Sequence, residues 1–188
     1  MTVSEDLPQN LPKPIDDGKA DHLTGMSLPD LSLLLSSGKK LNISKLINCV
    51  LFIFPKAGSS LEDPIDFEIW DAIPGARGCT PQSCAYRDLN NEFSKYGFDI
   101  FGLSVQKPEV LKEVQERNHI PFDLISDSDL ELTGELSLPT FMFKSRELIK
   151  RITLIIKNGK IKKVFYPVFP SDKDATTTLN YIIEHHTK

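Results

Sequence analysis

The alternation of apolar and polar runs along the chain predicts a series of short strands and helices. Six consecutive apolar residues at 49–54 are typical of a strand that is buried on both faces of a sheet, and Pro55 ends this strand. Other segments have strand character, namely two short runs around a glycine turn after Leu28, then 99–104, 122–125 and 141–143. Helical patterns cover 80–96, 108–118, 126–136 and 172–186. Near the end, 148–156 and 160–166 flank Asn158-Gly159, a strong hairpin-turn signal.

Strands that alternate with helices and end in an antiparallel hairpin predict an α/β protein with a mixed central sheet flanked by helices. A thioredoxin-like sheet is one member of that class, and the pattern alone does not select it. A length of 188 residues suits one domain with its own core. We expect 1–20, which are rich in proline and acidic residues, to be a flexible lead-in to a single domain at 21–188. Within it, 58–77 is expected to be a long loop.

Composition excludes several classes of partner. The net charge is −4 and no basic cluster is present, so nucleic acid is not an expected partner. No apolar run has the length of a membrane span, and the first residues lack the basic start and apolar centre of a signal peptide, so we expect a cytoplasmic protein. Three cysteines in such a chain indicate catalytic, redox or buried thiols rather than a disulfide framework. Their spacing does not match a zinc site, and neither a metal nor a cofactor is expected.

Cys79 is placed at the start of the helix expected at 80–96, where Gly78 or Thr80 can act as the cap and Pro81 falls in the first turn. The free amide N–H groups and the helix dipole at that end favour a negative charge, so this thiol is expected to be more thiolate at neutral pH. A thiolate attacks a peroxide oxygen and becomes a sulfenic acid. Cys79 is therefore the candidate nucleophile, and a second cysteine can trap its sulfenic acid as a disulfide.

Cys84 follows five residues later in the same helix. Regular helix geometry separates the two Cα atoms by roughly 8–9 Å, whereas a disulfide needs about 4.4–6.8 Å. A Cys79–Cys84 bond therefore requires the first turns of the helix to unwind. Spacing alone equally fits two cysteines that only pack in the interior, because free cysteine is among the most buried residue types. By the same preference, Cys49 in its apolar strand is interpreted as a core residue.

The chain closely resembles the Q-type peroxiredoxins, also called bacterioferritin comigratory proteins, in the segments FPKA at 54–57 and GCTPQSCAYRD at 78–88. Further matches follow in chain order at 101–104, 121–127 and 151–161. The last of these is similar to the family's arginine-bearing hairpin. The resemblance covers roughly residues 20 to 187 and is most specific around the two cysteines.

This resemblance implies a thioredoxin-like fold and a thiol-dependent peroxidase for hydrogen peroxide or small organic hydroperoxides. It implies that Cys79 is the peroxidatic cysteine, that Cys84 resolves the sulfenic acid as an intramolecular disulfide, and that thioredoxin or a similar dithiol recycles the enzyme. Arg151 falls where the family keeps an active-site arginine, whose cation can stabilise a thiolate and hydrogen-bond the peroxide. A surface or salt-bridging arginine is the alternative. Relatives are often monomeric, so a monomer or weak dimer is expected.

The long stretch at 58–77 is a departure from the family pattern, because it separates the Pro-Lys-Ala segment from the cysteine. Ala76 stands where the family has a threonine whose hydroxyl helps to hold thiolate and peroxide. Ser59, a water or a backbone amide are the alternatives, and no residue is assigned this role. The inserted loop carries three large apolar side chains that either pin it to the body or form a lid or partner surface: Phe67, Ile69 and Trp70.

The two cysteines also fit other functions. A thiol–disulfide oxidoreductase is less favoured because the usual CxxC is absent. A redox sensor or binding module, switched by oxidation of Cys79 and Cys84, uses the same thiol chemistry, and an inactive scaffold is a further alternative. Turnover separates these functions, since a sensor oxidises once whereas a peroxidase cycles with a reductant.

Overall fold

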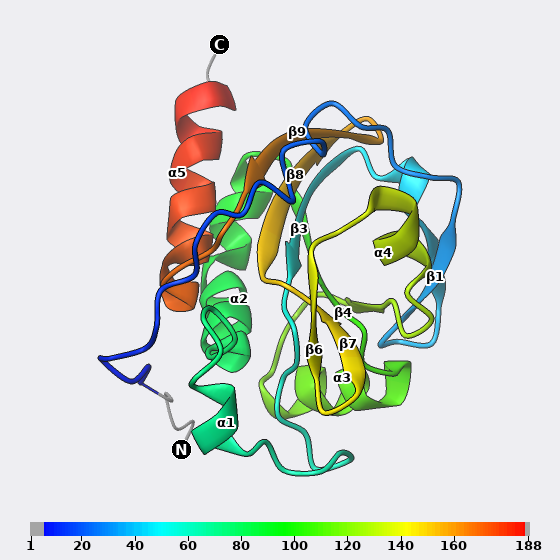
Figure 1. The fold of residues 1–188 in the computed structure, drawn as a ribbon. Coiled ribbons are helices and arrows are strands. Elements are labelled where there is room, and N and C mark those ends of the chain that lie inside the picture. Colours follow the sequence, from blue (N-terminus) through cyan, green and yellow to red (C-terminus); the bar gives the residue numbers. More distant parts are fainter. Residues whose placement is uncertain (1–5, 187–188) are drawn as a thin grey trace.

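The computed structural model describes residues 6–186, which form a large mixed sheet, a small two-stranded sheet and flanking helices (Figure 1). The strands are β1 (Ser32–Leu35), β2 (Lys40–Asn42), β3 (Asn48–Ile53), β4 (Asp99–Ser104), β5 (Leu124–Ser126), β6 (Thr140–Phe143), β7 (Arg146–Ile149), β8 (Ile152–Lys157) and β9 (Lys160–Phe165). The helices are α1 (Phe67–Trp70), α2 (Cys79–Lys95), α3 (Pro108–Arg117), α4 (Glu131–Leu136) and α5 (Asp174–His186), with 3-10 turns η1 (Ile43–Lys45) and η2 (Ser171–Lys173).

The large sheet has the strand order β2-β1-β5-β4-β3-β8-β9. Strands β3, β4 and β5 are parallel to one another, whereas β8 pairs antiparallel with β3, and β9 antiparallel with β8. The mixed sheet predicted from the sequence is therefore confirmed. Strand β3 lies inside the sheet, and its residues from Cys49 to Ile53 are fully buried, as expected for an apolar run with both faces covered.

The two faces of the sheet carry separate hydrophobic cores. Alternate residues of β3 face opposite sides: Phe52 packs with side chains of α2, α3 and α5, whereas Leu51 packs with α4 and the β6–β7 hairpin. Figure 1 shows α2 and α5 side by side on one side of the sheet and α4 on the other. Within residues 6–186, no helix combines the length and the apolar composition that crossing a membrane requires.

The expected hairpin arm at 148–156 is wrong in one respect, because the structure divides it between two sheets. Residues up to Ile149 belong to β7 and pair with β6, and residues from Ile152 belong to β8 and pair with β3 and β9. Between them, the Lys150 amide donates to the Pro139 carbonyl and the buried side chain of Arg151 turns away from the sheet. A buried guanidinium needs hydrogen-bond acceptors that an apolar sheet face does not supply, so the strand breaks there.

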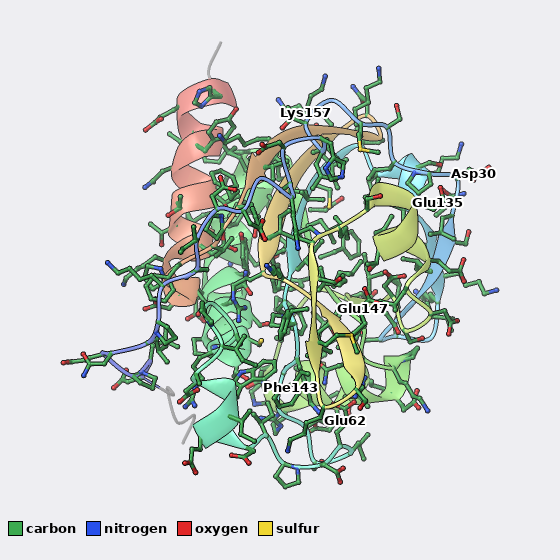
Figure 2. All side chains as sticks on the ribbon, viewed as in Figure 1. Asp30, Glu62, Glu135, Phe143, Glu147 and Lys157 are labelled. Carbon is green, nitrogen blue, oxygen red and sulfur yellow. The ribbon has the colours of Figure 1, made fainter. Side chains whose placement is uncertain are left out.

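The inserted loop is held to the body by Trp70, whose side chain is 1% exposed. Its ring meets Phe143 of β6 edge-to-face at a centroid distance of 4.9 Å. Figure 2 shows Phe143 and Glu62 close to one another near the turn of the β6–β7 hairpin, where Arg146 donates to Glu62 at 2.9 Å. The loop is thus pinned by one tryptophan and tied by ion pairs, while Phe67 and Ile69 stay largely exposed, at 44% and 48%.

Most side chains of residues 6–20 in the expected lead-in are exposed and Ala20 is buried, and residues 1–5 lie outside the described residues. Asp17 accepts hydrogen bonds from Lys150 and Tyr166, both at 2.8 Å. The bond from Lys150 holds the pKa of Asp17 well below its usual range. This segment therefore contacts the chain immediately next to Arg151.

We predict that Trp70→Ala lowers the free energy of unfolding by about 3–5 kcal/mol, because it empties a large, closed aromatic site. The matched change Ile69→Ala, in the same one-turn helix but exposed, should lower it by less than about 1 kcal/mol. Urea unfolding followed by circular dichroism measures both values. Equal losses from the two variants would contradict the pinning role of Trp70.

Candidate active site

Cys79 is the first residue of α2, one position earlier than the sequence pattern indicated. Gly78 is the N-cap and has a left-handed backbone, with φ of 104°. A Cβ on Gly78 would lie 1.9 Å from Ser171 Oγ, so only glycine fits both the conformation and the space. No side chain caps this end of α2, and the positive end of the helix dipole there favours an anion. The local sequence thus places the Cys79 sulfur where a negative charge is stabilised.

The guanidinium of Arg151 contacts the Cys79 sulfur directly. Arg151 Nη2 lies 3.3 Å from Cys79 Sγ, and both residues are only 4% exposed. Carbonyl oxygens fix the guanidinium in this position: Nη2 also donates to Ala76 O at 2.8 Å, and Nε donates to Gly75 O at 3.2 Å. A cation in a buried site interacts with the atom it contacts over a short, poorly screened distance, because little water lies between them.

Behind Arg151 lies a buried network of hydrogen bonds that the sequence analysis did not identify. Arg151 Nη1 donates to Gln82 Oε1, and Gln82 Nε2 donates to Asp174 Oδ2 at 2.8 Å. The same Asp174 oxygen accepts from Tyr86 Oη at 2.8 Å and from Thr153 Oγ1 at 2.7 Å. Burial raises the pKa of Asp174, while these hydrogen bonds and the charge of Arg151 act in the opposite direction. No pattern in the sequence marks Asp174, since it is one acidic residue at a helix start.

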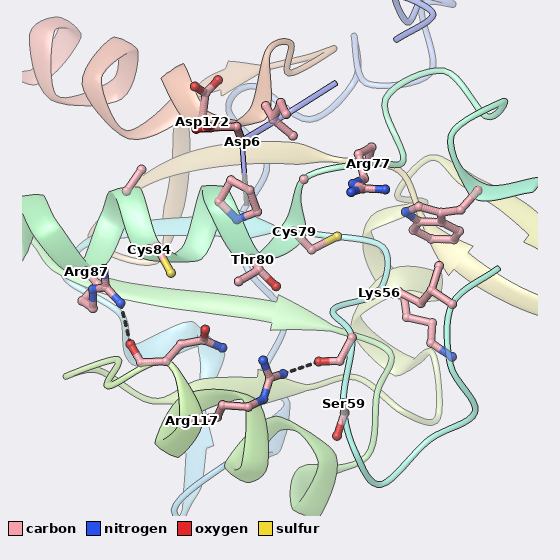
Figure 3. Close-up of a pocket in the computed structure, with 18 of the residues that line it drawn as sticks. Asp6, Lys56, Ser59, Arg77, Cys79, Thr80, Cys84, Arg87, Arg117 and Asp172 are labelled. Atoms are coloured by element: carbon pink, nitrogen blue, oxygen red, sulfur yellow. Dashed lines mark hydrogen bonds between the residues drawn. The ribbon is translucent and has the colours of Figure 1, made fainter. Parts of the chain in front are cut away.

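Cys79 opens into a cavity of about 770 Å³ that Cys84 also lines (Figure 3). Figure 3 shows the two sulfur atoms on successive turns of α2 rather than in contact. All three cysteines of the chain are free thiols, and α2 is unbroken between Cys79 and Cys84. The structure therefore brings Cys79 and Arg151 together and keeps Cys84 apart, as the geometry of an intact helix requires.

The cationic side chains around the cavity are all paired with acidic partners. The pairs are Lys56 with Glu62, Arg77 with Asp71, Arg87 with Asp88, and Arg117 with Glu113. Figure 3 shows these four cations spread around the cavity wall. These four charges are balanced locally, whereas Arg151 contacts the sulfur directly.

Ser59 does not take the place of the family's threonine hydroxyl, because it points elsewhere. Its Oγ donates to Glu113 Oε2 at 2.6 Å, at the far side of the cavity from Cys79. Ala76 has no hydroxyl, and its carbonyl accepts from Arg151 and, at 3.8 Å, from the Cys79 thiol. Thr80 also lines the cavity.

Cys49 lies in the interior of the sheet, as its apolar surroundings predicted. It is fully buried, and desolvation raises the pKa of its thiol strongly. A thiol of this kind is unreactive. Among the residues that the structure describes, no group of three or more His, Cys, Asp or Glu side chains is arranged to hold a metal ion.

Comparisons with known proteins identify relatives of this chain. A family profile described as Redoxin matches residues 23–180. Peroxiredoxin Bcp from Escherichia coli K12 is 36% identical over 112 residues, which span 57% of this chain and 71% of that protein. Chloroplastic Peroxiredoxin Q from Populus jackii is 27% identical over 161 residues, which span 84% of this chain and 67% of that protein.

Solved structures share the fold. Peroxidoxin BcpB from Mycobacterium tuberculosis gives a TM-score of 0.69 at 23% identity, over 87% of this chain and 99% of that one. Peroxiredoxin Q from Xanthomonas campestris gives a TM-score of 0.67 at 21% identity, over 88% of this chain and 98% of that one. The thioredoxin-like fold implied by the sequence resemblance is thereby confirmed. The chain belongs to the Redoxin family and, within it, to the Q-type peroxiredoxins, which are thiol-dependent peroxidases.

Proposed function

We propose that this enzyme reduces hydrogen peroxide and small organic hydroperoxides through Cys79, with Arg151 as the cation that activates the thiolate. The observation that carries the proposal is the contact of 3.3 Å between Arg151 Nη2 and Cys79 Sγ in a buried site. The start of α2 adds a second source of positive potential at the same atom. The cavity of about 770 Å³ is much larger than hydrogen peroxide and admits an organic substituent.

In the first step, the Cys79 thiolate attacks the outer oxygen of the peroxide. A sulfur–oxygen bond forms as the oxygen–oxygen bond breaks, so Cys79 becomes a sulfenic acid and the peroxide leaves as an alkoxide or hydroxide that takes up a proton. Sulfur is oxidised by two electrons and the peroxide is reduced by two. Arg151 can hydrogen-bond the negative charge as it moves from sulfur to oxygen, which lowers the barrier.

In the second step, Cys84 attacks the sulfenic sulfur, a disulfide forms with Cys79, and water leaves. This step requires the first turns of α2 to unwind, because the intact helix holds the two cysteines on different turns. An external dithiol, thioredoxin or a similar protein, then reduces the disulfide by thiol–disulfide exchange and is itself oxidised.

We place this cycle in the cytoplasm, where thiol reductants keep cysteines reduced, and the three free cysteines are compatible with such a compartment. The proposed working unit is the single domain at 21–188, with 58–77 as its insertion, acting as a monomer or weak dimer without nucleic acid or membrane partners. Size-exclusion chromatography with light scattering tests the oligomeric state.

We predict that Cys79→Ser abolishes peroxide consumption, because the nucleophile is lost. Cys84→Ser should still react once with peroxide but lose turnover with thioredoxin, thioredoxin reductase and NADPH. The measurement is NADPH oxidation, with mass spectrometry of the cysteines after a single addition of peroxide. A Cys84→Ser variant that cycles as fast as wild type would remove Cys84 from the mechanism, and a single oxidation without turnover in wild type would favour a redox sensor.

We predict that Arg151→Lys lowers the second-order rate constant for peroxide by about 100-fold or more, because an ammonium cannot contact the sulfur and several carbonyls at once. The matched control is Arg146→Lys, since Arg146 is exposed on β7, does not line the cavity and makes no contact with Cys79. Its partner Glu62 keeps its ion pair with Lys56 in this variant. Stopped-flow mixing with hydrogen peroxide measures both rate constants. Equal rate constants for Arg151→Lys and wild type would exclude Arg151 from the chemistry.

A further inference from the structure

Asp174 is a buried carboxylate at the point where α5, α2 and β8 meet. It is the first residue of α5 and is 4% exposed. Its Oδ2 accepts three hydrogen bonds, from Gln82 and Tyr86 of α2 and from Thr153 of β8. Burial raises the pKa of Asp174, whereas the three donors and the charge of Arg151 favour its ionised form.

One chain of contacts connects Asp174 to the reacting sulfur. Asp174 accepts from the amide nitrogen of Gln82, which orients the side chain so that its amide oxygen faces Arg151. That oxygen accepts from Arg151 Nη1, while Nη2 of the same guanidinium contacts Cys79 Sγ. The guanidinium is planar and rigid, so fixing Nη1 also fixes the position of Nη2. The Asp174 carboxylate therefore orients Gln82, which holds Arg151 together with the carbonyls of Gly75 and Ala76.

The same carboxylate is hydrogen-bonded to the part of α2 that unwinds in the proposed cycle. Gln82 lies between Cys79 and Cys84, and Tyr86 lies two residues beyond Cys84. Both are completely buried, and both donate to Asp174. A disulfide between the two cysteines cannot form until the Gln82 contact breaks, because this residue is within the segment that loses its helical form.

We propose that Asp174 is a positioning residue with opposite effects on the two steps of the cycle. Its carboxylate speeds the attack on peroxide, because it holds Arg151 against Cys79 through Gln82. It slows disulfide formation, because it keeps the first turns of α2 folded. This inference rests on the proposed peroxidase cycle and adds a residue that controls how long the sulfenic acid persists.

The test is Asp174→Asn, which keeps the size of the side chain but removes its charge and turns one acceptor into a donor. Hydrogen bonds to a charged acceptor are about twice as strong as neutral ones, so the network is weakened without opening a cavity. Trp70, the only tryptophan, lines the cavity of Cys79 and is a fluorescent reporter in stopped-flow mixing with hydrogen peroxide. Mass spectrometry of acid-quenched samples assigns each phase to the sulfenic acid or to the disulfide.

For Asp174→Asn we expect the peroxide-dependent phase to slow by about tenfold and the peroxide-independent phase to become several-fold faster. A general loss of stability lowers the amplitudes of both phases but does not move the two rate constants in opposite directions. The matched control is Glu184→Gln on the exposed side of α5, which makes the same change in charge and should alter neither rate constant. If either rate constant of Asp174→Asn equals that of wild type, the proposal is wrong.

Tyr86→Phe is a second, milder variant that keeps the proposal testable if Asp174→Asn does not fold. It removes one contact between α2 and Asp174 and leaves the chain from Asp174 through Gln82 to Arg151 in place. Only disulfide formation should become faster, by about threefold or more, and the peroxide-dependent phase should match wild type. An unchanged rate of disulfide formation, or an equal change in both phases, would contradict the proposal.

Oxidation of Cys79 in the wild-type protein distinguishes a failure of this inference from a failure of the function on which it rests. If peroxide oxidises wild-type Cys79 but the variants behave as wild type, only the role of Asp174 is refuted. If peroxide leaves wild-type Cys79 unoxidised, the proposed cycle itself is refuted.

Discussion

The buried guanidinium of Arg151 is the constraint on which much of this structure depends. A cation with five N–H donors can be enclosed only if acceptors converge on it from several directions. Here they come from the end of the insertion, from α2 and from the thiol itself. Three features of the fold bring these acceptors together. They are the break between β7 and β8, the path of the chain before Cys79, and the packing of α2 against α5. The surroundings of Cys79 and the packing of the fold are thus coupled through one side chain.

The insertion at 58–77 departs from the family pattern, yet both of its ends are fixed to the domain. At its start, the Ala57 amide and carbonyl are both held by the buried side chain of Gln106. At its end, Gly75 and Ala76 present carbonyls to Arg151. Trp70 anchors the middle of the insertion by packing against Phe143. Extra residues can therefore be accommodated without moving Cys79. The two carbonyls accept from the guanidinium and cannot donate a hydrogen bond to a thiolate, so they do not reproduce the family's threonine hydroxyl.

Helix α2 has to meet two opposing requirements. In the proposed cycle it must be folded for its dipole and Arg151 to act on Cys79, and it must unwind for Cys84 to reach the oxidised sulfur. Both requirements are met if the first turns of α2 have intermediate local stability, as in other elements that move during function. Gly78 supplies no side-chain hydrogen bond to the start of the helix, whereas Gln82 and Tyr86 tie it to Asp174. In the proposed cycle, these contacts must break before the helix opens.

The sequence by itself determined the features that follow from local patterns. The apolar run of β3, the glycine before Cys79 and the placement of Cys79 at a helix start could be predicted, because periodicity and caps are encoded by adjacent residues. The resemblance to a family supplied Arg151. Only the tertiary structure showed that the hairpin arm breaks at Arg151, that Ser59 donates to Glu113, and that Gln82 connects Arg151 with Asp174. Gln82 is separated by 69 residues from Arg151 and by 92 from Asp174, and no local pattern specifies which distant acceptor a buried charge will find.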